Sequence, residues 1–127
     1  MDLHKQRNMA TIDKSSPEFL QALKDVEEFF LLMQFRQNSF LQKGYAYYVE
    51  FKRNDTIVLY FYGPGEYNLE MIVTTAKRKF SFGDLLTIPI IATWVSNNKY
   101  IDKYEKSLKN SFLYYIEILK IALPIIE

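Results

Sequence analysis

Glu50 and Glu70 are the two carboxylates whose placement in this 127-residue sequence could support acid–base catalysis. They fall on two predicted strands that flank a third, and we expect both side chains beside Val58 on one sheet face. The spacing between neighbouring strands then sets their Cα atoms about 9–10 Å apart. Carboxyl pairs at a comparable separation act as general acid and base in inverting glycosidases. Because the sequence indicates no cleft around them, we favour the simpler interpretation of two glutamates on a solvated sheet face.

Other arrangements for catalysis or metal binding find less support in the sequence. The single histidine, His4, lies in a polar N-terminal stretch, and the chain has no cysteine. A histidine in a loose tail is not held in place to activate a nucleophile or ligate a metal ion. The glycines are scattered at predicted turns and lack the spacing of a phosphate-binding loop. We therefore predict that the protein is not an enzyme, with no catalytic residue, no metal site and no cofactor.

The elements that would position Glu50 and Glu70 are three short antiparallel strands, predicted between Gly44 and Thr74. Side chains alternate clearly in the first strand, whereas the second, Thr56 to Tyr62, is apolar on both sides. The register of this second strand against the first therefore has to be inferred from the length of the turn between them. We expect a three-residue loop, Arg53 to Asp55, because a two-residue loop would mix charged side chains into the apolar face.

This register predicts one apolar sheet face and one mixed face, with Leu59 near the centre of the apolar one. The second turn, Tyr62 to Glu66, is expected to set Phe61 opposite Tyr67. The predicted apolar face comprises Tyr45, Tyr47, Val49, Phe51, Ile57, Leu59, Phe61, Tyr67, Leu69, Met71 and Val73. The predicted mixed face comprises Tyr48, Glu50, Lys52, Val58, Tyr60, Asn68, Glu70, Ile72 and Thr74.

Helical sequence flanks the strands. Ser16, Pro17 and Glu18 indicate a helix start, and we expect this helix to continue to about Gln37. Its apolar residues recur at helical spacing and predict packing on the apolar sheet face: Phe19, Leu23, Val26, Phe30 and Met33. Arg36 to Lys43 is expected to be the connection into the first strand.

Two further helices are predicted after the strands. Following the basic turn Lys77 to Lys79, Ser81 and Asp84 form the pattern of a capping box, and Pro89 is expected to stop or kink the short helix that they begin. The stretch 90–95 suits either a helix or a short edge strand, and the sequence leaves both open. A long helix is expected from Tyr100 to about Leu123.

The second half of this long helix is apolar nearly all round. It has more hydrophobic perimeter than one sheet face can cover, so we predict a homodimer through the C-terminal helix, around Leu113, Ile116 and Leu123. Two ion pairs are expected in its first half, Asp102 with Lys106 and Glu105 with Lys109, and the two members of each pair are one helical turn apart. The fold class predicted from all these elements is α+β: an N-terminal helix, a three-stranded antiparallel meander, a short helix and a long C-terminal helix packed on the sheet.

Length and charge limit the remaining possibilities. The size predicts a tail at 1–15 followed by a single domain at 16–127, and the net charge of +1 is too small to indicate nucleic acid or an anionic membrane as partner. Lys43 to Tyr47 resembles the start of the RNA-recognition-motif signature, but Tyr48 and Glu50 depart from it. The chain has no hydrophobic leader and no run long enough to span a membrane, so we expect a cytoplasmic location.

Protein binding is the function that meets the fewest objections. Tyrosine buries a large rigid area and keeps a polar group, which is why it is enriched at interfaces. The predicted binding residues lie on the mixed sheet face: Tyr48, Glu50, Lys52, Tyr60, Asn68 and Glu70. A helix covering this face as a second core layer is an equally open interpretation. The alternative function is a small-molecule-binding or regulatory domain, with an aromatic pocket between the sheet and the C-terminal helix.

The layout from Val49 to Leu86 resembles that of small uncharacterised bacterial proteins, several of them immunity proteins of polymorphic-toxin systems. The segments that carry the resemblance are VEF, a polar turn, TIVLYFY, EYNLEMIV, a basic turn and FSFGDLL, about a third of the chain. It departs at Gly83, where a helix former is expected, and in the long C-terminal helix. The resemblance implies a cytosolic, non-enzymatic protein that binds and blocks a cognate toxin domain.

Overall fold

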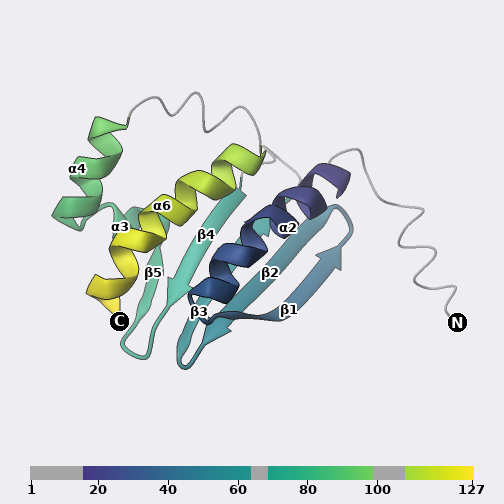
Figure 1. The fold of residues 1–127 in the computed structure, drawn as a ribbon, viewed down its shortest axis with the longest axis horizontal. Coiled ribbons are helices and arrows are strands. Elements are labelled where there is room, and N and C mark those ends of the chain that lie inside the picture. The colour runs from purple at the N-terminus through teal and green to yellow at the C-terminus, as the bar shows by residue number, and fades with distance from the viewer. Residues whose placement is uncertain (1–15, 64–68, 99–107) are drawn as a thin grey trace, which may run out of the picture.

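The computed structural model describes residues 16–63, 69–98 and 108–127 (Figure 1). Within them the chain folds as an antiparallel sheet of five strands, in the order β1-β2-β3-β4-β5, with helices packed on it. Figure 1 shows α2 and α6 side by side over one face of the sheet. The elements are α2 (Ser16–Leu32), β1 (Arg36–Lys43), β2 (Ala46–Arg53), β3 (Thr56–Tyr62), β4 (Leu69–Thr74), β5 (Lys79–Ser81), α3 (Phe82–Leu85), α4 (Pro89–Asn97) and α6 (Leu108–Ile126).

The predicted α+β class is confirmed, and so are an N-terminal helix and a long C-terminal helix, but the three-stranded meander is wrong. Two strands were missed at the edges of the sheet. β1 occupies the stretch expected to be a connection, and its side chains are almost all exposed, so it lacks the alternation that marks a half-buried strand. β5 has only three residues, which is too short to show a pattern.

Helix α2 ends at Leu32, five residues before the predicted end, because the chain reverses there to enter β1. Gln34 takes a left-handed conformation with φ 69°. The Gln34 N–H donates to the carbonyl of Leu31, and the Phe35 N–H to that of Phe30, at 2.9 and 2.8 Å. This is a Schellman ending, in which the N–H groups of the left-handed residue and of the residue after it satisfy the last helical carbonyls.

The predicted register of β3 is wrong by one residue. The β2–β3 loop has two residues, Asn54 and Asp55, so that Arg53 pairs with Thr56 and Phe51 with Val58. Asn54 takes a left-handed conformation at this turn, with φ 52°. Cross-strand partners share a face, so Val58 lies on the core face together with the buried Phe51 and not on the predicted mixed face.

This register turns Val58, Tyr60 and Tyr62 toward the helices, and Ile57, Leu59 and Phe61 toward the opposite face. The pairing with β4 is also different from the prediction, since Tyr62 pairs with Leu69 and Phe61 with Glu70. Charged and apolar side chains do share a face, as the rejected two-residue loop required. That arrangement is stable because the mixed face is not the one that forms the core.

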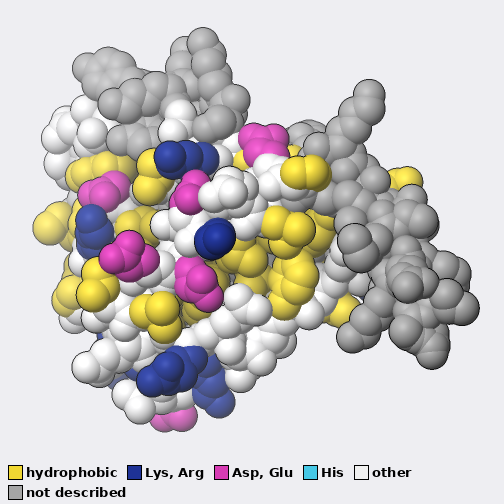
Figure 2. Space-filling view, turned by 45° about the vertical axis from the view of Figure 1, so that its right-hand side comes forward, with side chains coloured by type: hydrophobic (Ala, Val, Ile, Leu, Met, Phe, Trp, Pro, Cys, Tyr) yellow, Lys and Arg dark blue, Asp and Glu magenta, His cyan; other side chains and the backbone are white. Residues whose placement is uncertain are grey.

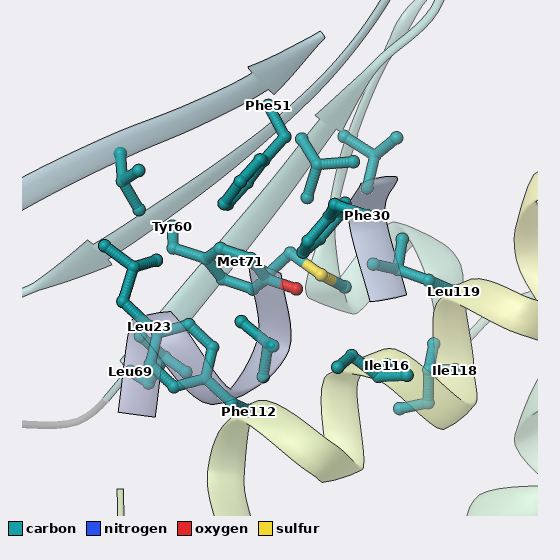
Figure 3. Close-up of a cluster of buried hydrophobic side chains, with 14 of the residues drawn as sticks. Leu23, Phe30, Phe51, Tyr60, Leu69, Met71, Phe112, Ile116, Ile118 and Leu119 are labelled. Atoms are coloured by element: carbon teal, nitrogen blue, oxygen red, sulfur yellow. The ribbon is translucent and has the colours of Figure 1, made fainter. Parts of the chain in front are cut away.

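The core lies between the sheet and the pair α2 and α6, and aromatic rings make up much of it (Figure 3). The rings of Phe30 on α2 and Phe51 on β2 stack with centroids 4.0 Å apart, and Phe112 on α6 meets Tyr60 on β3 edge-on at 4.9 Å. Phe19 on α2 contacts Phe112 at 5.8 Å. These contacts join both helices to the central strands, which confirms the expected packing of the two long helices on the sheet.

The predicted capping box is confirmed at the start of α3. The Asp84 N–H donates to Ser81 Oγ at 3.1 Å, and the Ser81 N–H donates to Asp84 Oδ2 at 2.9 Å. The hydrogen bond from the Ser81 N–H to the carboxylate is the main cause that lowers the pKa of Asp84, and the Ser81 side chain contributes. The stretch 90–95, for which the sequence left helix and strand open, is helical and belongs to α4. Pro89 is the first residue of this helix, a position whose N–H has no partner within the helix, so its absence in proline costs nothing.

Helix α6 extends to Ile126, and its predicted start at Tyr100 and the ion pairs of Asp102 and Glu105 lie outside the described residues. The predicted tail at 1–15 also lies outside them. Within the described parts of the chain, no helix is long and apolar enough to cross a membrane. Ile116 and Leu123 are buried in the core of the chain itself, which leaves Leu113 as the exposed residue of the predicted dimer surface.

Candidate functional site

The candidate site is the sheet face turned away from α2 and α6, which we call the outer face (Figure 1). Its side chains are exposed or half-buried, in contrast to the buried residues that alternate with them along each strand. The register of β2, β3 and β4 assigns nine residues to it: Tyr48, Glu50, Lys52, Ile57, Leu59, Phe61, Glu70, Ile72 and Thr74. The two long helices that could have covered this face are therefore on the other side.

A shallow hollow of about 250 Å³ lies on the outer face, lined by Tyr48, Leu59, Phe61, Glu70 and Ile72. Tyr48 and Phe61 are direct cross-strand partners, and their ring centroids are 4.9 Å apart. Leu59 and Ile72 are likewise partners in the next row along the strands. The hollow is thus an apolar floor with one carboxylate at its border, smaller than the roughly 300–1,000 Å³ of a typical small-molecule pocket.

The Glu50 carboxylate borders the same face and is held in place. Its Oε1 atom accepts hydrogen bonds from Asn38 Nδ2 at 3.0 Å and from Ser39 Oγ at 3.3 Å, both on β1. These two hydrogen bonds hold the side chain against β1. Glu50 therefore presents a fixed negative charge beside the apolar floor.

Four of the six predicted binding residues lie on the outer face: Tyr48, Glu50, Lys52 and Glu70. Asn68 lies outside the described residues. The placement of Tyr60 is wrong, because its side chain is fully buried in the core (Figure 3). Sequence reasoning missed Ile57, Leu59 and Phe61, and the two-residue Asn54-Asp55 turn was the signal that could have revealed them.

The expected arrangement of Glu50 and Glu70 beside Val58 is also wrong. Val58 is buried on the core face, and the two glutamates belong to different rows, Glu50 opposite Leu59 and Glu70 opposite Phe61. Glu50 is already bound by two donors from β1. The register thus does not place Glu50 and Glu70 opposite the same residue of β3.

The region expected to hold an aromatic pocket, between the sheet and α6, has its rings packed against one another. Tyr60, Phe112 and Phe19 form a chain of ring contacts there, and all three are fully buried. Figure 3 shows Tyr60 extending from β3 into the cluster toward Met71. These three residues are therefore part of the core.

Tyr60 leads to a prediction on stability, because its buried hydroxyl has no hydrogen-bond partner among the residues that the structure describes. A buried donor left unsatisfied costs about 1–3 kcal/mol. We expect Tyr60→Phe to raise the free energy of unfolding by about 1 kcal/mol, measured by urea denaturation. Tyr48→Phe, on the outer face, is the matched control and should change it little.

The dependence of this stability difference on alkaline pH provides a second test. Burial raises the pKa of Tyr60 well above its ordinary value, with a contribution from Tyr115. Above about pH 10 the unfolded chain therefore ionises this tyrosine while the folded chain does not, which favours unfolding. The stability difference between Tyr60→Phe and the wild type should widen as the pH rises through 10, and a constant difference would contradict the assignment.

Within the described parts of the chain, no group of three or more His, Cys, Asp or Glu residues is placed to hold a metal ion. The charges on the side of the molecule seen in Figure 2 are mixed, with acidic and basic side chains interspersed among hydrophobic ones over most of the surface. Comparison of the chain with protein-family models, curated proteins and solved structures gave no match.

Proposed function

We propose that this protein binds another protein through the outer face and carries out no reaction of its own. The observation that supports the proposal is the apolar hollow on a sheet face that neither long helix covers. Exposed contiguous apolar surface with a polar border is typical of interaction sites on soluble proteins. The mixed composition of the face, which would weaken a core, suits an interface.

The hollow is of the size to receive one large apolar side chain from the partner. Tyr48 and Phe61 form its aromatic wall, and rigid aromatic residues at the centre of an interface supply most of the binding free energy. Glu50, Glu70 and Lys52 lie around this centre with charges of both signs. Such charges at the border fix the orientation of the partner more than they add affinity.

A toxin domain is the partner class that we propose to test first. The support for it is the resemblance of Val49 to Leu86 to immunity proteins, together with an outer face able to bind a protein surface. An immunity protein is encoded beside its toxin, so the gene neighbouring this one supplies the candidate partner.

The binding prediction concerns the two rings of the hollow. Tyr48→Ala and Phe61→Ala should each weaken binding of the partner by about 2 kcal/mol or more, roughly 30-fold, as is usual for central aromatic residues. Isothermal titration calorimetry with the purified partner domain measures this effect. Tyr45→Ala is the matched control, since Tyr45 is an exposed tyrosine in the β1–β2 turn, outside the outer face, and should bind like the wild type.

Co-expression tests the proposal in cells. The neighbouring toxin domain should kill cells alone and spare them when this protein is present, and the double variant Tyr48→Ala/Phe61→Ala should lose that protection. Killing at the same rate with and without the protein would eliminate the immunity hypothesis. Protection that survives the double variant would instead move the interface away from the outer face.

A further inference from the structure

A second site lies at the end of the sheet where the β2–β3 turn meets the end of α2. It is an open cleft of about 400 Å³, lined by Gln34, Arg36, Gln37, Asn38, Lys52, Arg53 and Asn54. Three of these seven residues are cations, none is an acid, and the other four carry side-chain amides.

Two of the cations face each other without compensation. Arg36 on β1 and Lys52 on β2 are direct cross-strand partners, and both side chains are exposed. Among the described residues neither has an ion-pair partner. Like charges directly opposite each other destabilise a sheet, so this pair costs stability unless an anion lies between them.

The third cation, Arg53, forms a fixed wall of the cleft. Its Nη1 atom donates to the carbonyl of Met33 at 2.8 Å, its Nη2 atom pairs with the Glu127 carboxylate, and its guanidinium lies 4.4 Å from the centre of the Phe35 ring. Thr56 also donates to Glu127, at 2.6 Å. The charge of Arg53 is thereby neutralised, and the unpaired positive charge of the cleft belongs to Arg36 and Lys52.

The backbone around the cleft is irregular in three places. Gln34 and Asn54 are the two non-glycine residues with positive φ among the described residues, at 69° and 52°, and both line the cleft. The β1–β2 register shifts between Gln37 and Ser39, which places a bulge at Asn38. Bulges and strained residues are common beside binding sites, where they redirect side chains. Glu50, two positions before Lys52 on β2, accepts hydrogen bonds from Asn38 and Ser39.

We propose that this cleft binds the oxyanion group, phosphate or carboxylate, of a small molecule. The guanidinium of Arg36, the ammonium of Lys52 and the side-chain amides of Gln34, Gln37 and Asn54 line it, and oxyanions are the groups that such donors bind. Its volume lies within the usual range for small-molecule sites. This site is distinct from the hollow of the proposed protein interface, and Lys52 belongs to both surfaces.

The test is a titration of the full chain, without any partner, followed by the backbone amide signals in NMR. Inorganic phosphate and succinate are the two probes, each at constant ionic strength set with sodium chloride. We expect saturable shifts at Gln34, Gln37, Asn38 and Asn54, with half-saturation on the order of 1–10 mM because so small an anion makes few contacts. The probe that saturates at the lower concentration identifies the oxyanion as phosphate or carboxylate.

The decisive variant is Arg36→Gln/Lys52→Gln, which should weaken the response by about tenfold or more. This variant should fold, because it removes a like-charge pair. Its control, Lys24→Gln/Lys109→Gln, removes the same charge from exposed positions on α2 and α6 outside the cleft and should respond like the wild type. Saturation by neither probe, shifts spread over all basic residues, or an unchanged response in Arg36→Gln/Lys52→Gln would overturn the proposal. Because no partner protein is present, none of these results bears on the outer face.

Discussion

Val58→Asp should unfold the domain, whereas Leu59→Asp, at the next position of the same strand, should leave it folded. Val58 is fully buried on the core face of β3, opposite Phe51 and Val73. A carboxylate there has no partner and must either stay ionised in an apolar core or take up a proton, at a cost of several kcal/mol. That cost approaches the total stability of a small domain, about 5–15 kcal/mol.

Leu59 is half-buried on the outer face, and its replacement removes apolar contacts while leaving the new carboxylate in reach of water. We expect a loss of about 1–2 kcal/mol, within the range of ordinary single substitutions. Circular dichroism during heating distinguishes the two variants. The reverse result, an unfolded Leu59→Asp and a folded Val58→Asp, would restore the three-residue loop and refute the register on which the outer face depends.

Phe112→Ala should produce the second large effect, a loss of about 3–5 kcal/mol in the free energy of unfolding. Phe112 is fully buried and contacts Phe19 on α2 at 5.8 Å and Tyr60 on β3 at 4.9 Å, so one side chain connects both long helices to the sheet. Removing its ring leaves a cavity at the meeting point of three elements. The surrounding rings cannot fill it without losing their own contacts.

Leu113→Ala is the matched control on the same helix, since Leu113 is 38% exposed. It should cost less than about 1 kcal/mol, and urea denaturation of the two variants measures the difference. Equal losses for the two variants would mean that α6 is rotated about its axis relative to the structure. The contrast therefore tests the orientation of α6 as directly as the Val58 and Leu59 variants test that of β3.

Local pattern by itself determined much of the fold. The inward residues of α2, including Phe19, Val26 and Phe30, follow from helical spacing, and the structure buries all three. The capping box of Ser81 and Asp84 was also predictable, because its hydrogen bonds span only three residues of chain. In β2 the alternation of apolar and polar residues correctly assigned Tyr48 and Glu50 to the outer face.

The tertiary structure alone decided which face β3 turns to the core. Three large hydrophobic side chains lie on each face of β3, Val58, Tyr60 and Tyr62 on one and Ile57, Leu59 and Phe61 on the other. Burial of either set satisfies the sequence pattern almost equally. Tyr60 and Leu59 exchanged places relative to the prediction for this reason. The choice is made by the two-residue turn at Asn54 and by packing against Phe30 and Phe112, which are distant in sequence.

The local sequence pattern also could not predict the edge strand β1, the outer face or the cleft. β1 pairs with β2 through backbone hydrogen bonds, which any side chain permits, so its polar sequence looks like a connection. The outer face is open because α2 and α6 both pack on the other side, a decision of topology (Figure 1). The cleft of Arg36, Lys52 and Arg53 depends on the pairing of β1 with β2. This pairing brings Arg36 opposite Lys52, which lies 16 positions later in the chain.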